Sequence, residues 1–268
     1  MANAYKKNNP RDSILLKPSL AFISGATSGL GKELSYRLAH MGVPLFLTAR
    51  DESALLSLEQ ELEKTTSVLV FAADLSSPSE LALLLQKITL YGPDLIINNA
   101  GLGLYGDILS FSLEEQMQMV QVNIDALVRI SIESARALKN QKKKGTIVNI
   151  SSMAGHFTYP YFTLYAASKL FVQHFSLSLD AELSSQGIRV LTSVLGRFAS
   201  PFFKKASKVA INPNSWDVMS LSKTASLVLR QTEKQKNYDI IDYRYKILQF
   251  FSYFIPKKIT TSLLRRKM

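Results

Sequence analysis

The stretch Ser24-Gly25-Ala26-Thr27-Ser28-Gly29-Leu30-Gly31 lies directly after a short apolar run, residues 20–24 (LAFIS), and opens an amphipathic stretch over residues 30–41. Glycines spaced in this way between a strand and a helix allow a tight turn, let the backbone approach a pyrophosphate and let the helix pack close to the strand. The helix N-terminus then presents free N–H groups and a partial positive charge to the phosphates. A purely structural glycine turn would have the same pattern. Because this one lies at the first strand–helix junction, the sequence predicts a cofactor-binding turn made by Gly25, Thr27, Ser28, Gly29, Leu30 and Gly31.

Short apolar runs and helical patterns alternate along the following part of the chain. The apolar runs are residues 44–48, 68–72, 95–97, 146–150 and 190–194, and the helical patterns are residues 52–64, 79–90, 113–139 and 163–184. This alternation is typical of repeated βαβ units, because parallel strands need a crossover connection between them. We therefore expect a Rossmann-type three-layer α/β fold with a parallel sheet flanked by helices on both faces.

The pattern is less regular at the two ends of the chain. Residues 1–18 form an N-terminal tail, and residues 196–232 contain glycine, prolines and aromatics that indicate a substrate loop or lid, with a helix over 221–231. Two amphipathic pieces, 245–254 and 259–266, belong to a basic C-terminal extension over residues 243–268. No repeat or low-complexity linker divides the sequence, so we expect a single domain over residues 1–268.

The end of the second predicted strand bears on which nicotinamide cofactor fits. An acidic residue there would bind both ribose hydroxyls and repel a 2′-phosphate. Here the strand ends in Thr48-Ala49-Arg50, and a guanidinium is a strong, often bidentate partner for phosphate. Asp51 follows at once, but we expect it to cap the next helix. Arg50 as an ordinary surface charge is the alternative; the sequence favours NADP(H).

Tyr165, Lys169 and Ser152 form a candidate catalytic set. Tyr165 and Lys169 are four residues apart, so in a helix they share one face. A tyrosine has a pKa near ~10 in isolation, and a close ammonium ion stabilises the phenolate and lowers that pKa. Ser152 ends an apolar strand, at the edge where parallel sheets bind ligands. Each residue alone is unremarkable, and their conjunction predicts proton transfer to a carbonyl oxygen.

The sequence resembles the short-chain dehydrogenase/reductase family, in its short single-domain branch, over about residues 20–203. Ser152 precedes Tyr165 by thirteen residues, as in the family, which selects it over Ser151. The matching pieces occur in the family order and are SGATSGLG (24–31), Asp74-Leu75, Asn98-Asn99-Ala100-Gly101, Asn123, Ile150-Ser151-Ser152, Tyr165 and Lys169. Two departures are Ser24, where the family has threonine, and Leu195-Gly196, where it has Pro-Gly.

The resemblance implies a role for each matched position. Tyr165 is the acid/base, Lys169 lowers its pKa and holds the nicotinamide ribose, and Ser152 orients the reacting oxygen. Asn123 anchors a water that links Lys169 to solvent, although a packing role for this mid-helix asparagine stays open. The implied cofactor residues beyond the first turn are Arg50, Asp74, Leu75, Asn99, Ala100, Gly101, Tyr165, Lys169, Gly196 and Phe198. The family also implies a homodimer or homotetramer formed through its long helices.

Composition limits the other function classes. The chain has 268 residues, 47% of them hydrophobic and 20% charged, which suits one sizeable core. It has no cysteine, which excludes disulfides and thiolate chemistry, and no apolar run of the ~20 residues that span a bilayer. No apolar run precedes the first strand, so we expect no secretory signal and a cytoplasmic protein. His40, His156 and His174 lack metal-ligand spacing; we expect no metal and assign them no role.

The net charge of +11 is concentrated at the C-terminus. After Asp242 there is no acidic residue, whereas seven cations follow: Arg244, Lys246, Lys257, Lys258, Arg265, Arg266 and Lys267. No nucleic-acid motif accompanies them, so we expect no nucleic-acid partner. A basic amphipathic segment favours peripheral contact with an anionic membrane. A helix packed over the substrate loop or against a second subunit is the alternative.

The loops after the predicted strands are rich in apolar side chains. They contain Leu102, Leu104, Met153, Phe157, Phe162, Phe198, Phe202, Phe203 and Trp216. A pocket lined by them would favour an apolar or lipid-like ketone or aldehyde, unless most of them only pack the lid. We therefore expect an NADPH-dependent carbonyl reductase. The alternatives are a 3-oxoacyl-thioester reductase and a binding protein that senses NADP(H) without turnover.

Overall fold

A seven-stranded, entirely parallel sheet forms the centre of the computed structural model, which describes residues 17–207, 215–252, 254–255 and 261–262. The strand order is β3-β2-β1-β4-β5-β6-β7. The strands are β1 (Ala21–Ser24), β2 (Leu45–Ala49), β3 (Val68–Ala72), β4 (Leu95–Asn98), β5 (Gly145–Ser152), β6 (Ile188–Leu195) and β7 (Tyr238–Ile240). The order reverses between β1 and β4, which is the position where doubly wound sheets bind ligands. The predicted Rossmann-type fold is confirmed.

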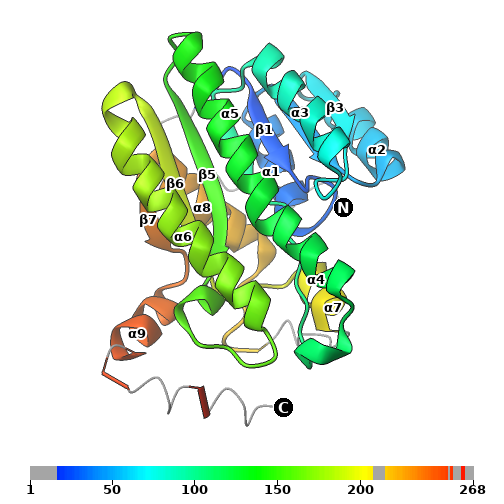
Figure 1. Cartoon of the computed structure of the whole chain (residues 1–268). Helices are drawn as coiled ribbons and strands as arrows, with labels where there is room; N and C mark the ends of the chain where they lie inside the picture. The colour runs from blue at the N-terminus through cyan, green and yellow to red at the C-terminus, as the bar shows by residue number, and fades with distance from the viewer. Residues whose placement is uncertain (1–16, 208–214, 253, 256–260, 263–268) are drawn as a thin grey trace.

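Helices cover both faces of the sheet (Figure 1). One face carries α1 (Gly29–His40), α2 (Glu52–Leu62) and α8 (Leu221–Glu233), and the other carries α3 (Pro78–Tyr91), α4 (Leu113–Val120), α5 (Leu127–Asn140) and α6 (Thr163–Leu183). In β1, Ala21 and Ile23 contribute to the first layer and Phe22 to the second, and all three are fully buried. Burial on both faces explains why these strands are apolar throughout rather than alternating.

Several helices begin at side-chain caps that the sequence supplies. Asp51 caps α2 by accepting from the Ala54 N–H at 3.0 Å, as predicted. Ser77 caps α3 and Ser220 caps α8, while Ser112 forms a capping box on α4. Such caps satisfy N–H groups that the helix itself leaves without partners.

The structure differs from the predicted elements in three places. The helical pattern over 113–139 contains a π-helical turn, η2 (Gln121–Ala126), between α4 and α5. The edge strand β7 was not predicted, because three residues are too few for a periodic signal. Within the segment 196–232, residues 201–207 form α7, whereas α8 is core structure with Ala225 and Val228 fully buried.

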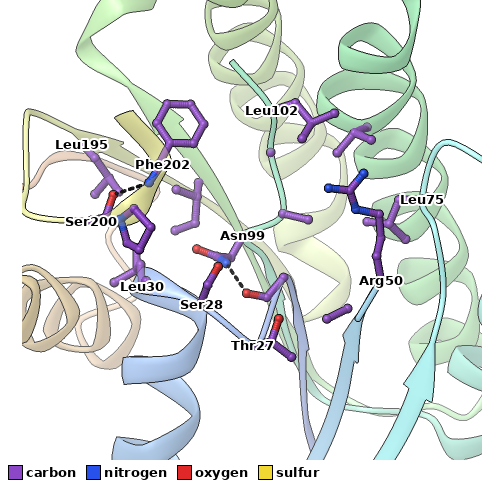
Figure 2. Close-up of a pocket in the computed structure, with 18 of the residues that line it drawn as sticks. Thr27, Ser28, Leu30, Arg50, Leu75, Asn99, Leu102, Leu195, Ser200 and Phe202 are labelled. Carbon is purple, nitrogen blue, oxygen red and sulfur yellow. Dashed lines mark hydrogen bonds between the residues drawn. The ribbon is translucent and has the colours of Figure 1, made fainter. Parts of the chain in front are cut away.

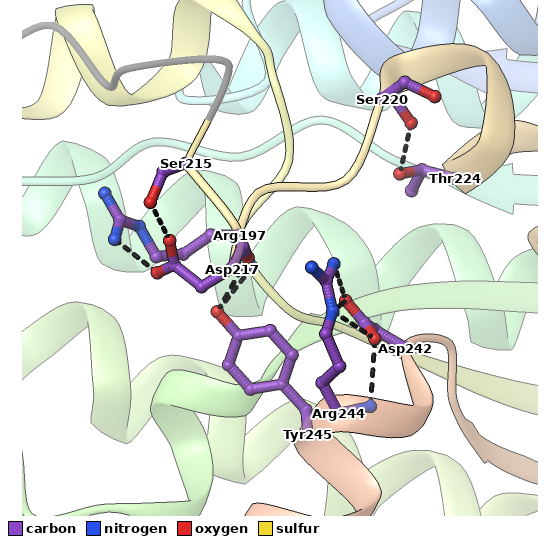
Figure 3. A network of polar contacts seen from close by, with 8 residues as sticks. All are labelled: Arg197, Ser215, Asp217, Ser220, Thr224, Asp242, Arg244 and Tyr245. Carbon is purple, nitrogen blue, oxygen red and sulfur yellow. Dashed lines mark hydrogen bonds and ion pairs between the residues drawn. The ribbon is translucent and has the colours of Figure 1, made fainter.

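The C-terminal extension begins with α9 (Tyr243–Ser252), and most of the piece predicted over 259–266 lies outside the described residues. Asp242 pairs with Arg244 at the start of this helix, and Tyr245 reaches the loop around Arg197 and Asp217 (Figure 3). Among the described residues, no helix is long and apolar enough to cross a membrane.

Candidate active site

The turn after β1 is built for close approach of the backbone. Gly25 and Gly29 have φ values of +66° and +51°, a region that side chains with a Cβ rarely adopt. A Cβ on Gly31 would lie 2.3 Å from the Gly25 carbonyl oxygen, so only glycine lets α1 sit this close to the turn. The hydroxyl of Ser24 accepts from the N–H groups of Asn99 and Ala100 at 3.1 and 3.0 Å. This ties the end of β4 to the turn.

The start of α1 differs from the capped helices. Its N-cap residue, Ser28, makes no side-chain hydrogen bond to the helix, and no acidic residue lies in the first turn. The N–H groups there retain their donor capacity, and the positive end of the helix dipole is not neutralised. A phosphate fits this arrangement, since a Cβ at Gly25 or Gly31 would crowd the turn.

A cleft of about 460 Å³ runs along the carboxyl ends of the strands. Figure 2 shows Arg50 and Leu75 on one side of it and Leu195, Ser200 and Phe202 on the other. Ser152 lines the cleft, and so does every residue predicted to bind the cofactor except Gly31. These cofactor residues are Gly25, Thr27, Ser28, Gly29, Leu30, Arg50, Asp74, Leu75, Asn99, Ala100, Gly101, Tyr165, Lys169, Gly196 and Phe198.

Arg50 lies exposed at one end of this cleft. Its guanidinium makes no hydrogen bond or ion pair with any residue that the structure describes. The adjacent Asp51 carboxylate is occupied, because it accepts from the Ser53 hydroxyl and the Ala54 N–H. A cation is therefore available at the end of β2 beside a carboxylate that already caps a helix.

Ser152, Tyr165 and Lys169 meet at the other end. Ser152 ends β5 and hydrogen-bonds the Tyr165 phenol, while its Oγ accepts from the Ala154 N–H at 3.1 Å. Lys169 Nζ donates to the Ile150 carbonyl at 3.0 Å and lies 5.7 Å from the centroid of the Tyr165 ring. The set combines a hydroxyl, a phenol and an amine on the floor of the cleft.

Burial controls the ionisation of this set. It raises the pKa of Tyr165 to about 12, with the Ser152 hydrogen bond acting in the opposite direction, and it lowers the pKa of Lys169 to about 8. The net pKa of Tyr165 is therefore raised rather than lowered, and the effect of the Lys169 ammonium on it stays a prediction. The reason is that desolvation of the enclosed phenol is the larger effect, and the Lys169 amine is directed at a backbone carbonyl.

The short chain dehydrogenase family model matches residues 19–210. The chain belongs to the short-chain dehydrogenase family. It is 34% identical over 173 residues to a diacetyl reductase ((S)-acetoin forming) from Staphylococcus epidermidis, which covers 63% of this chain and 67% of that protein. It is 33% identical over 219 residues to a very-long-chain 3-oxoacyl-CoA reductase from Neurospora crassa, covering 77% of this chain and 65% of that one.

A solved structure supports the same assignment. A short-chain dehydrogenase from Sphingobium yanoikuyae in complex with NADPH superimposes with a TM-score of 0.79 at 26% identity, covering 87% of this chain and 93% of that one. This short-chain dehydrogenase is therefore an oxidoreductase of alcohol and carbonyl groups in small molecules, on a fold that binds a nicotinamide cofactor.

Asn123 does not line the cleft of this short-chain dehydrogenase. It lies in the π-helical turn η2, where its side chain accepts from the Leu102 N–H at 2.8 Å and donates to the Leu102 carbonyl at 2.9 Å. It also donates to the Ser168 hydroxyl at 3.1 Å. The side chain thus clamps the loop after β4 to α6. The water-anchoring role stays a prediction.

The apolar residues predicted around the substrate divide into separate groups. Leu102, Phe198, Phe202 and Phe203 line the cleft, and Leu104 and Phe162 join Leu102 and Phe202 in the cluster around Tyr165. The prediction is wrong for Met153 and Phe157, which pack against Val194 and Ile240 on β6 and β7. It is also wrong for Trp216, which is 80% exposed and does not line the cleft.

Two residues near the catalytic set were missed by the sequence reasoning. Gln173 is 3% exposed, and its Nε2 donates to the Ser152 carbonyl at 3.0 Å and the Ser151 hydroxyl at 3.2 Å. His156, which was assigned no role, hydrogen-bonds Tyr238 and Gln249. The four-residue spacing of Tyr165, Lys169 and Gln173 was a sequence signal that could have identified Gln173.

Proposed function

We propose that this short-chain dehydrogenase is an NADPH-dependent carbonyl reductase with Tyr165 as its acid. The observation that carries the proposal is the meeting of Ser152, Tyr165 and Lys169 at one end of a cleft whose other end has Arg50, which is not paired with any described residue. When bound, the reduced nicotinamide supplies a hydride to the carbonyl carbon. Gly25, Gly29, Asn99 and the start of α1 would hold the cofactor.

The residues of the chain would handle the proton. The buried Tyr165, with its raised pKa, keeps its proton at neutral pH and gives it to the substrate oxygen as negative charge develops there. Ser152 donates a hydrogen bond to the same oxygen, which lowers the cost of that charge. Lys169, largely protonated below its pKa of about 8, stabilises the phenolate left on Tyr165.

The test is NADPH oxidation with a panel of carbonyl compounds. Tyr165→Phe removes the transferable proton and keeps the ring against Phe162, so we expect kcat to fall at least a hundredfold with NADPH binding retained. Turnover that persists in Tyr165→Phe would overturn the mechanism. NADPH binding without turnover by the unmodified protein would instead favour a sensor of NADP(H).

The preference for NADPH over NADH is proposed from Arg50. The Arg50 guanidinium has no partner among the described residues and lies next to a carboxylate, Asp51, that caps a helix, which suits a 2′-phosphate. The Sphingobium structure contains NADPH. Arg50→Ala should raise KM for NADPH about tenfold and leave KM for NADH unchanged. Arg129→Ala, on a cation already paired with Asp125, is the matched control. Equal loss for both cofactors in Arg50→Ala would remove Arg50 as the phosphate ligand.

The proposed substrate is an apolar or lipid-like carbonyl compound. Leu102, Phe198, Phe202 and Phe203 give the cleft an apolar wall beside Tyr165. The similarity to a very-long-chain 3-oxoacyl-CoA reductase favours a 3-oxoacyl thioester as a second candidate. Ketones and thioesters of increasing chain length should show rising kcat/KM. Reduction of small hydrophilic carbonyls alone would contradict an apolar substrate.

We also propose that α9 contacts an anionic membrane surface. Tyr245 and Gln249 hold one side of the helix to the protein, whereas the opposite side carries Ile247, Phe250 and Phe251, each more than half exposed. The sequence after residue 255 adds five cations and no acidic residue. Exposed aromatic rings beside cations suit the boundary between the acyl chains and the headgroups of a bilayer. Each basic residue near an anionic surface contributes ~1 kcal/mol to the free energy of membrane binding. The location would then be cytoplasmic and peripheral.

Vesicle co-sedimentation tests this contact. The full-length protein should sediment with vesicles that contain phosphatidylserine and stay in solution with phosphatidylcholine alone. Phe250→Ser with Phe251→Ser should weaken sedimentation, whereas Leu109→Ser, which removes an 89% exposed side chain elsewhere, should not. If the paired change alters the oligomeric mass and not sedimentation, this side of α9 is a protein interface.

A further inference from the structure

A hydrogen-bonded chain of side chains joins Ser152 to α9. It starts at Gln173, which lies one helical turn beyond Lys169 on the face of α6 that carries Tyr165. The Nε2 of Gln173 donates to the Ser152 carbonyl at 3.0 Å. It also donates to the Ser151 hydroxyl, which in turn donates to the Lys169 carbonyl at 2.8 Å. One buried amide therefore contacts the backbone of Ser152 and, through Ser151, that of Lys169.

The chain continues to the sheet edge and the C-terminal extension. The Tyr238 hydroxyl, on β7, donates to Gln173 Oε1 at 3.4 Å and lies 2.8 Å from His156 Nε2. His156 ends the short helix η3 (Met153–His156), which begins directly after Ser152. Gln249 Nε2, on α9, lies 2.9 Å from the same imidazole nitrogen. Three segments that are distant in sequence, η3, β7 and α9, thus meet at one histidine, and Tyr238 links it to α6.

The local environment favours a fixed arrangement. Gln173 is almost fully buried, and a Cβ on Gly155 would lie 2.9 Å from its Nε2, so the amide has little room to move. Burial lowers the pKa of His156, which keeps the ring neutral near pH 7. One lone pair on Nε2 then accepts from the Gln249 N–H and from the Tyr238 hydroxyl, whose proton is shared between His156 at 2.8 Å and Gln173 Oε1 at 3.4 Å. Buried polar chains of this kind fix side-chain positions when every member has a partner.

We propose that Gln173, Tyr238 and His156 are positioning residues that fix Ser152 relative to Tyr165 and make this position depend on how α9 is seated. The proposal rests on the proposed function, because it needs Ser152 to act on the substrate oxygen. Contact of α9 with a membrane or another surface would then change the position of the Ser152 hydroxyl relative to the reacting atoms. Small displacements of a positioned group can cost large factors in rate.

The experiment measures kcat and KM separately in the full-length protein. Gln173→Met keeps the length of the side chain and removes its donor, so kcat should fall about tenfold with KM for NADPH within about twofold. Gln249→Leu should lower kcat in the same way. Because both changes interrupt the same chain of hydrogen bonds, kcat of the double variant should be no lower than kcat of Gln173→Met alone. Leu248→Gln, on the neighbouring and partly exposed position of α9, is the control and should keep the original kcat.

Tyr238→Phe is a second variant that keeps the test decisive if Gln173→Met is poorly folded. It removes only one hydroxyl from an edge strand and retains the ring. It should reproduce the fall in kcat without a lower melting temperature. Unchanged kcat in Gln173→Met and Tyr238→Phe, or additive losses in the double variant, would overturn the proposal. The proposed function fails separately, by turnover that survives Tyr165→Phe.

Discussion

At the scale of single residues, the Ser24 hydroxyl holds two N–H groups that have to be satisfied inside the protein. It is 2% exposed and accepts from Asn99 and Ala100, which line the cofactor cleft. Ser24→Ala would leave both donors without an acceptor, so we expect the free energy of unfolding to fall by about 2–3 kcal/mol. NADPH affinity should fall as well, because the end of β4 loses its tie to the turn.

Ser24→Thr is the matched control for this prediction. It keeps the acceptor, and threonine is the residue that the family resemblance places here. Urea unfolding and NADPH titration of both variants would measure the two effects. Equal stability of Ser24→Ala and the unmodified protein would show that other groups or water replace the hydroxyl.

Lys169 gives a pH dependence whose sign follows from its burial. Its pKa falls from 10.5 to about 8 on folding, so between these values the unfolded chain binds more protons than the folded one. Stability contributed by this site therefore rises with pH across the window, by about 2 kcal/mol between pH 7 and pH 9.5. Tyr165, whose pKa rises from 10.0 to about 12, lowers stability only above pH 10.

Lys169→Met removes this dependence. Urea unfolding at pH 7 and pH 9.5 should show that the unmodified protein gains about 2 kcal/mol relative to Lys169→Met at the higher pH. The same comparison with Lys223→Met, an exposed lysine on α8, should show no difference. A constant gap between the unmodified protein and Lys169→Met would mean that the amine is hydrated in solution.

At the scale of elements, the packing of α1 against the turn after β1 depends on one missing Cβ. A methyl group on Gly31 would lie 2.3 Å from the Gly25 carbonyl and 2.6 Å from Asn99 Nδ2. Gly31→Ala should therefore push α1 away from the sheet and weaken NADPH binding at least tenfold. Lys32→Ala, at the next and exposed position, should bind normally in the same titration. Normal binding by Gly31→Ala would show that the turn adapts.

Sequence periodicity predicted most of the elements but not their irregularities. The runs over 68–72 and 146–150 were found because buried parallel strands are apolar throughout. The π-helical turn around Asn123 was not, because one extra residue in a helix hardly changes an apolar pattern over 113–139. The strand β7 and the partners of His156 depend on contacts between distant segments, which local spacing does not encode.

The residues of the cleft were likewise predictable from the sequence only in part. Tyr165 and Lys169 were predictable because helical spacing places them on one face, and Gln173 continues that spacing. The direction of the Tyr165 pKa shift was not predictable, because it depends on how completely Phe162 and Phe202 enclose the ring. Met153 and Phe157 were assigned to the wrong cluster for a similar reason, since apolarity alone does not say which cavity a side chain enters.

At the scale of the whole molecule, α6 presents a surface that suits a second copy of this chain. The helix has 21 residues, and its sequence contains no charged residue between Lys169 and Asp180. Leu170 and Phe171 are each 41% exposed, and Phe171 stacks on Phe175 at 5.9 Å. Interface cores are depleted in charge and rich in aromatics, and a symmetric dimer uses the same patch from both subunits.

We therefore expect a homodimer, or a tetramer built from it, with α6 packed against its counterpart. Phe171→Glu would place two carboxylates in the apolar core of such an interface, which costs several kcal/mol and should reduce the mass to that of a smaller species. Light scattering after size exclusion measures this directly. Leu90→Glu, at a 73% exposed position on α3, is the control and should keep the original mass. A monomer at micromolar concentration in the unmodified protein would contradict the prediction, and Leu170 and Phe171 would then be exposed to water without a partner subunit.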